Sequence, residues 1–293
     1  LGLTLGGGGA RGGAHVGVLR VLDEIGYRPD VVTGTSIGGV IAALVGAGWS
    51  VDEIERLAHD TPFDELFNIG RKGDGLLGNE ALKEMLCGFF GDADLEDLPI
   101  RTGVVAADLV NNQPVLLERG PVVTAVLATT AVPGLFPAVR SEGRRFVDGG
   151  ILSNVPTRAA YMLGAERLVA VDVGGHMDLG LALNDVGNFS RRLQRVLYWL
   201  LNLSKRQTAF DVFIQSTILS YSALVQYELA AYPPDVLIRP DIPNVGLMSM
   251  ERLPETIEPG EAAAREAAPA IQQLVQNRWR RRRPMYDIPP LLT

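Results

Sequence analysis

Residues 1–13, LGLTLGGGGARGG, place a short apolar run directly before a loop in which six of the eight residues 6–13 are glycine. The run 1–5 predicts a buried strand, and the spacing of Val18, Leu22 and Ile25 predicts a helix over 13–25. A glycine-rich loop between a strand and a helix presents backbone N–H groups at the positive end of the helix dipole. This stretch therefore predicts an α/β protein with an anion-binding loop after its first strand.

Three interpretations of this loop compete. Gly7, Gly9 and Gly12 fit the G-x-G-x-x-G pattern of dinucleotide sites, but the end of the next predicted strand, TGTS at 33–36, lacks the carboxylate that holds a ribose. No Gly-Lys-Ser/Thr follows, which argues against a phosphate-binding P-loop. The second interpretation is a turn needed only for tight packing, but such a turn needs fewer glycines. An oxyanion hole, whose donors contribute roughly 3 to 4 kcal/mol each in the transition state, is the favoured interpretation.

The nucleophile that an oxyanion hole requires is predicted by GTSIG at residues 34–38. This matches G-x-S-x-G, the turn between a strand and a helix that exposes a serine. The preceding residues 31–33 favour a strand, and residues 37–47 favour a helix of small side chains. Both loops are then expected at the carboxyl ends of neighbouring strands, where open α/β sheets form their sites.

Two kinds of base for Ser36 stay open. A Ser-His-Asp triad would need one of three histidines: His15 is expected to pack inside a helix, His59 to be solvated, and His176 to lie in a loop after a strand. The competing base is Asp148, at the end of a predicted strand and followed by two glycines. A desolvated carboxylate within hydrogen-bond reach can take the serine proton directly, although Asp-Gly is also a common turn.

Three motifs, in this order, resemble the patatin-like phospholipase family: GGGARG at 7–12, GTSIG at 34–38 and DGG at 148–150. The resemblance covers about residues 1–175 and extends to NVP at 154–156 and to His15. It implies a Ser36–Asp148 dyad that cleaves phospholipids, lysophospholipids or related acyl esters through an acyl-enzyme, with no metal and no cofactor. The oxyanion hole that it implies is made by the amides around Gly8, Gly9, Arg11 and Gly12.

Two alternatives remain open beside this function. One is a lipid-binding protein with vestigial catalysis, which the intact motifs disfavour. The other is a Ser-His-Asp esterase that uses His176.

The remaining pattern predicts a single domain over residues 1–293, a three-layer α/β/α sandwich with a mostly parallel central sheet, as in patatin-like proteins. Residues 185–232 form a predicted helical insertion. Pro259 and Gly260 are expected to precede the last helix. Further helices are expected over 37–47, 51–59, 79–90, 122–129, 157–163 and 261–275, and strands over 30–33, 102–106, 115–117, 146–147, 168–173 and 236–238.

Composition narrows the function classes. A net charge of −7 disfavours a nucleic-acid binder, apart from a local basic run at 280–283. One cysteine, Cys87, excludes an intramolecular disulfide. No run reaches the roughly 18 to 20 apolar residues that a membrane span needs. These features predict a cytoplasmic protein, with a targeting segment upstream of Leu1 left open.

The expected partner is a lipid or another acyl ester. Residues 189–205 form a basic amphipathic pattern, which fits either core packing or a dimer contact, the commoner uses, or a lipid-contacting cap at a membrane surface. Residues 213–229, mostly apolar and poor in charge, fit an acyl-chain tunnel or a lid. The oligomeric state stays open.

Overall fold

A computed structural model describes residues 1–61, 77–175 and 209–276. Its centre is an eight-stranded sheet in the order β5-β6-β3-β2-β1-β7-β8, with β4 paired to β3. The neighbours from β3 to β8 are parallel, whereas β4 and β6 run antiparallel to β3 and β5 runs antiparallel to β6. The strands are β1 (Gly2–Leu5), β2 (Val31–Thr35), β3 (Arg101–Asp108), β4 (Gln113–Leu117), β5 (Val139–Ser141), β6 (Arg144–Asp148), β7 (Leu168–Val171) and β8 (Val236–Ile238).

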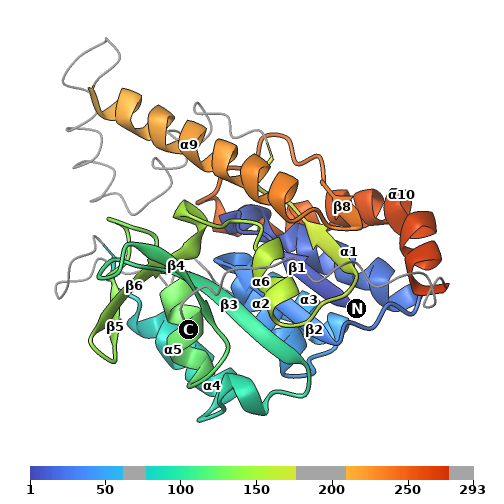
Figure 1. Cartoon of the computed structure of the whole chain (residues 1–293), viewed down its shortest axis with the longest axis horizontal. Helices are drawn as coiled ribbons and strands as arrows, with labels where there is room; N and C mark the ends of the chain where they lie inside the picture. Colours follow the sequence, from blue (N-terminus) through green and yellow to red (C-terminus); the bar gives the residue numbers. More distant parts are fainter. Residues whose placement is uncertain (62–76, 176–208, 277–293) are drawn as a thin grey trace.

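Helices cover both faces of the sheet (Figure 1). The face that carries Leu3 and Val32 packs against the larger group of helices, α1 (Gly13–Glu24), α2 (Ile37–Gly46), α3 (Val51–Asp60), α4 (Glu80–Phe90), α5 (Val122–Thr129) and α10 (Ile257–Gln276). The face that carries Val31 and Ala170 packs against α6 (Thr157–Met162) and α9 (Ala209–Ala231). Alternate residues of the same strands thus enter different layers, as pleating requires. The three-layer α/β/α architecture predicted from the sequence is confirmed.

Strand β3 aligns the two segments that carry the candidate nucleophile and base. Its first half pairs in parallel with β2, where Thr35 lies opposite Val105. Its second half pairs antiparallel with β6, where Asp148 lies opposite Ala106. Because Val105 and Ala106 are consecutive, the last residues of β2 and β6 pair with neighbouring residues of β3.

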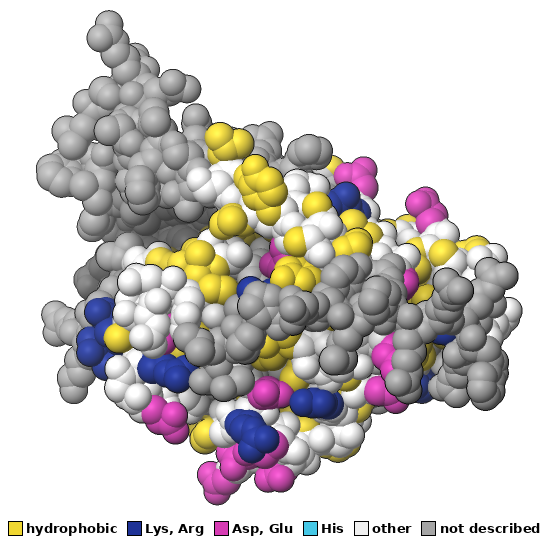
Figure 2. Space-filling model, in the orientation of Figure 1, with side chains coloured by type: hydrophobic (Ala, Val, Ile, Leu, Met, Phe, Trp, Pro, Cys, Tyr) yellow, Lys and Arg dark blue, Asp and Glu magenta, His cyan; other side chains and the backbone are white. Residues whose placement is uncertain are grey.

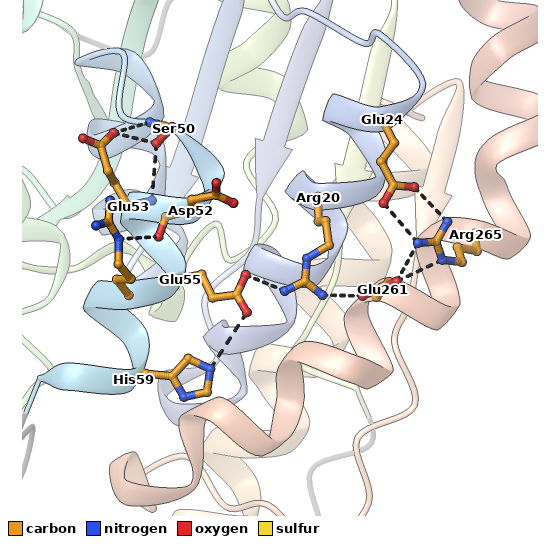
Figure 3. A network of polar contacts seen from close by, with 10 residues as sticks. Arg20, Glu24, Ser50, Asp52, Glu53, Glu55, His59, Glu261 and Arg265 are labelled. Carbon is orange, nitrogen blue, oxygen red and sulfur yellow. Dashed lines mark hydrogen bonds and ion pairs between the residues drawn. The ribbon is translucent and has the colours of Figure 1, made fainter.

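An ion-pair network fastens the first and last helices at a distance from these strand ends (Figure 3). Arg20 of α1 pairs with Glu55 of α3 and with Glu261 of α10. Arg265 of α10 pairs with Glu24 at 2.9 Å. These groups are partly or fully exposed, so water and salt screen the pairs and each contributes little to stability. The apolar contacts of Ile257, Ala264 and Ile271, which are all buried, contribute more to holding α10 against the core.

Most predicted elements lie within a few residues of their expected bounds, and β8 matches its predicted range. The start of the last helix is wrong: α10 begins at Ile257 and contains both Pro259 and Gly260. A proline in the first turn lacks only an N–H that has no partner within the helix, so it does not break it. Gly260 is required by packing, since a Cβ atom there would lie 2.0 Å from the Ala14 carbonyl oxygen. Strand β5 was not predicted; its three residues are only partly buried or exposed.

The predicted insertion 185–232 is described from Ala209 onward, as α9. Its Val225 and Leu229 are buried beside Val155 and Ala170. Within the described ranges, no helix is both long and apolar enough to cross a membrane. The amphipathic pattern at 189–205, His176 and the basic run at 280–283 lie outside the described residues. The single-domain assignment and the role of the insertion stay predictions.

Candidate active site

Ser36 lies in the turn between β2 and α2 with φ 55° and ψ −129°, a conformation that residues with a side chain rarely adopt. Its backbone N–H donates to Thr129 Oγ1 at 2.9 Å, and Thr129 Oγ1 in turn donates to the Val105 carbonyl at 2.6 Å. A fully buried threonine from the end of α5 thereby holds the turn. A turn between a strand and a helix is thus present at the residues GTSIG, with Ser36 partly exposed in it.

The glycines on either side of Ser36 are required by close contacts. A Cβ atom on Gly38 would lie 2.2 Å from the Leu5 carbonyl oxygen, and one on Gly34 would lie 2.1 Å from the Gly38 carbonyl oxygen. Neither obstacle is a side chain that could rotate away. The turn consequently presses the start of α2 onto the carboxyl end of β1, where the glycine loop begins.

Asp148 meets Ser36 from the end of β6. The Ser36 hydroxyl donates to Asp148 Oδ2 at 2.6 Å, and the Gly150 N–H donates to Asp148 Oδ1 at 2.8 Å. The Asp148 side chain has one polar partner on each oxygen, and the residue is only 5% exposed. Both carboxylate oxygens are therefore fixed, one of them on the serine hydroxyl.

Burial raises the pKa of Asp148 to about 6, because a desolvated carboxylate is less stable than the neutral acid. The hydrogen bonds from Ser36 and Gly150 oppose this shift by stabilising the charged form. The result is a carboxylate that is ionised at neutral pH and more basic than an exposed aspartate. These are the properties of a general base that works near pH 7.

The glycine loop lies against the serine turn. A Cβ atom on Gly7 would lie 3.1 Å from Ser36 Cβ, and one on Gly12 would lie 3.1 Å from Ile37 Cβ. Of the predicted oxyanion donors, the Arg11 N–H donates to the Gly8 carbonyl at 3.1 Å. The Gly8 and Gly9 N–H groups have no acceptor among the residues that the structure describes. The loop thus lies against the serine turn and carries two N–H groups that donate to no described residue.

Long-range contacts hold this loop in place. The buried Arg11 guanidinium donates from Nε to the Val245 carbonyl at 2.8 Å and from Nη1 to the Gly174 carbonyl at 2.7 Å. Asn154 Nδ2 donates to the Gly7 carbonyl at 3.0 Å, and the Asn154 carbonyl accepts from the Gly7 N–H at 3.1 Å. Four hydrogen bonds to residues in three distant segments of the chain therefore fix the loop.

The histidines take different places. His15 is fully buried, its Nε2 lies 2.7 Å from the Gly6 carbonyl oxygen, and burial lowers its pKa to about 4. It is neutral at pH 7 and supports the start of the glycine loop, which agrees with the expected packing role. His59 is exposed at the end of α3, as predicted. His176 cannot be placed relative to Ser36, because it lies outside the described residues.

Thr129 and Tyr221 also lie at the site, and neither was predicted from the sequence. The half-buried Tyr221 of α9 lies near the site: a Cβ atom on Gly150 would lie 3.6 Å from Tyr221 Cε2 and 3.1 Å from Asp148 Oδ1. Neither residue belongs to a local motif. Only the register of the sheet brings Thr129 to Ser36, and only the packing of α9 brings Tyr221 to Asp148.

Comparison with known proteins agrees with this architecture. The model of a family described as patatin-like phospholipase matches residues 3–161. In the crystal structure of VipD from Legionella pneumophila, a similar fold covers 92% of this chain and 66% of that chain, with a TM-score of 0.57 and 16% identity. At this identity the likeness concerns the fold alone.

Curated relatives extend the match along the chain. An uncharacterized NTE family protein of Mycobacterium tuberculosis is 27% identical over 333 residues, which cover 92% of this chain and 91% of the relative. Lysophospholipase NTE1 of Candida albicans is 29% identical over 180 residues, which cover 59% of this chain and 13% of that protein. This chain belongs to the patatin-like phospholipase family, and it is a lipid ester hydrolase of the phospholipase and esterase type.

Proposed function

We propose that the chain hydrolyses acyl esters of phospholipids or lysophospholipids with Ser36 as the nucleophile and Asp148 as the general base. The observation that carries this proposal is the 2.6 Å hydrogen bond from Ser36 Oγ to Asp148 Oδ2. A buried carboxylate with a raised pKa fits the role of a base, and a hydroxyl held in a strained turn fits that of a nucleophile. The similarity to a lysophospholipase supports a glycerolipid substrate.

The proposed reaction has two halves. Asp148 takes the Ser36 proton while Oγ attacks the ester carbonyl carbon, and the Gly8 and Gly9 N–H groups bind the resulting oxyanion. The bond to the alcohol then breaks, Asp148 returns the proton to the leaving oxygen, and an acyl-enzyme remains on Ser36. Asp148 next takes a proton from water while the hydroxide attacks the acyl-enzyme, and it returns this proton to Ser36 Oγ as the bond to the acyl group breaks and the fatty acid leaves. Arg11 and Gly12 shape the loop that supplies these donors.

A fluorophosphonate probe tests the nucleophile directly. We expect covalent labelling at Ser36, located by mass spectrometry of the digested protein, because the probe reacts only with an activated hydroxyl. The Asp148→Asn variant should label far more slowly, since its hydroxyl lacks a base. A wild-type protein that stays unlabelled would contradict the proposal and favour a lipid-binding protein without catalysis.

The pH dependence tests the base. Only ionised Asp148 can accept the Ser36 proton, so kcat/KM should rise with pH up to a plateau, with an apparent pKa of about 6. Below that value, activity should fall about tenfold per pH unit. The measurement is kcat/KM between pH 4.5 and 8 by release of free fatty acid.

An imidazole would give a similar midpoint, so temperature provides the control for this profile. Ionisation of a carboxyl group is almost independent of temperature, whereas that of an imidazole is not. A midpoint that moves clearly downward on warming would point to His176 in place of Asp148.

A further inference from the structure

The inner side of α9 faces the site, and its outer side faces solvent. Tyr221, Val225 and Leu229 follow one another at intervals of four residues and pack on the sheet beside Val155 and Ala170. Glu228 joins this side to α6, because its Oε1 accepts the Arg158 N–H at 3.3 Å. On the outer side, Leu219 and Tyr227 are each 72% exposed, and Figure 2 shows hydrophobic side chains on the surface above α9.

Tyr221 spans the gap between the ends of β6 and β7. Its ring lies near Gly150, beside Asp148. Its hydroxyl lies at the other side of the ring, near Gly174: a Cβ atom on Gly174 would be 3.4 Å from Tyr221 Oη, 3.4 Å from Asn154 Nδ2 and 3.3 Å from Asp172 Oδ1. The hydroxyl therefore lies among polar groups at the strand ends that surround the candidate active site.

This hydroxyl has no hydrogen-bond partner among the described residues. Other buried or half-buried tyrosines do have one: Tyr27 donates to the Gly2 carbonyl at 2.6 Å, and Tyr161 donates to the Pro233 carbonyl at 2.7 Å. The hydroxyl of a half-buried tyrosine can be bonded by water or by a ligand, and a phenylalanine would fill the same space without a polar atom. The Tyr221 hydroxyl is therefore a donor that is available to a molecule bound at these strand ends.

The surroundings limit the chemistry of that molecule. Burial and the nearby Asp148 and Asp172 raise the pKa of Tyr221 well above its usual range, so the phenol stays protonated and can donate. The Asp172 carboxylate, which lies with the Tyr221 hydroxyl around Gly174, accepts from Arg239 Nε and from the Gly174 N–H, each at 3.1 Å. A donor beside a carboxylate suits a neutral hydroxyl group better than a phosphate.

We propose that Tyr221 is a specificity-determining residue whose hydroxyl donates a hydrogen bond to the alcohol part of the ester substrate, and that it favours polyol esters such as those of glycerol. This inference rests on the proposed function, in which Asp148 returns a proton to the leaving oxygen. The alcohol must then lie beside Asp148, which is where the Tyr221 ring lies. The acyl chain, being apolar, offers the phenol no partner.

The test compares two esters of one fatty acid, a glycerol monoester and an ethyl ester. Both form the same acyl-enzyme, so any difference between them arises before the alcohol leaves. Tyr221→Phe should lower kcat/KM for the glycerol ester by about tenfold, the contribution of one hydrogen bond. For the ethyl ester we expect a change of less than about twofold.

Tyr227→Phe is the matched control, because it removes the same hydroxyl from the exposed side of the same helix. It should leave both esters unaffected. An equal loss for both esters in Tyr221→Phe, or no loss for either, would overturn the role assigned to Tyr221, as would a wild-type preference for the ethyl ester. Fluorophosphonate labelling distinguishes failure of the proposed function from failure of this inference. If wild-type Ser36 stays unlabelled, the proposed function fails. If Tyr221→Phe labels as fast as the wild type but does not lose kcat/KM selectively for the glycerol ester, only the role of Tyr221 is rejected.

Discussion

Replacing Ser36 with alanine is expected to reduce ester hydrolysis to the background rate, a loss on the order of 10⁴- to 10⁶-fold in kcat. The variant keeps the glycine loop and Asp148 but has no oxygen to form the acyl-enzyme, so the covalent route is closed. The measurement is turnover of a p-nitrophenyl ester by purified protein, with fluorophosphonate labelling in parallel.

Ser36→Gly provides a second inactive variant that also reports on the strained turn. The φ of 55° at Ser36 suits glycine, and a non-glycine residue in such a region costs about 1 to 3 kcal/mol. The glycine variant should therefore unfold at a higher denaturant concentration than Ser36→Ala. Full turnover by either folded variant would reject Ser36 as the nucleophile.

Replacing Asp148 with asparagine is expected to lower kcat by on the order of 10³- to 10⁴-fold. The side chain keeps its shape, and its amide can still bond Ser36 and Gly150, but it cannot accept a proton. Turnover of the same ester measures the effect. Full activity in Asp148→Asn combined with loss of activity in His176→Ala would move the role of base to the histidine.

The same variant should be more stable than the wild type at neutral pH. The folded protein holds the Asp148 proton up to a pKa of about 6, whereas an unfolded chain releases it near pH 4. The folded state therefore binds more protons between these values, and stability falls as pH rises through this window, by about 3 kcal/mol in all. Asp148→Asn should gain roughly this amount above pH 6 and nothing below pH 4, as urea unfolding at several pH values would show.

The layers of the fold could be predicted because apolar runs, and the glycines that separate strands from helices, are local signals in the sequence. The run 1–5 and the spacing around Leu22 sufficed for β1 and α1. Local signals failed where packing decides the outcome. Gly260 is typical of a helix boundary, but here it lies inside α10 because the close approach of Ala14 leaves no room for a side chain. Strand β5 has little signal of its own and is defined by its pairing with β6.

Some residues of the candidate site lie in local motifs, whereas the contacts that hold them depend on packing. Ser36, Asp148 and the glycine loop belong to short motifs, so the sequence could indicate them together. The contacts that hold them belong to no motif: Thr129 reaches Ser36 across 93 positions, and Arg11 reaches Val245 across 234. Tyr221 has even less local signal, because only the side of α9 that packs on the sheet determines where its hydroxyl lies.

The double pairing of β3 has a consequence for how such a chain can change. The hydroxyl and the carboxylate are spaced by the backbone ladder of a single strand, with Thr35 opposite Val105 and Asp148 opposite Ala106. Lengthening a connecting segment elsewhere leaves that spacing untouched, whereas inserting one residue between Val105 and Ala106 would turn Asp148 toward the opposite layer. Substrate preference can therefore diverge through the connecting segments while the reacting atoms keep their separation.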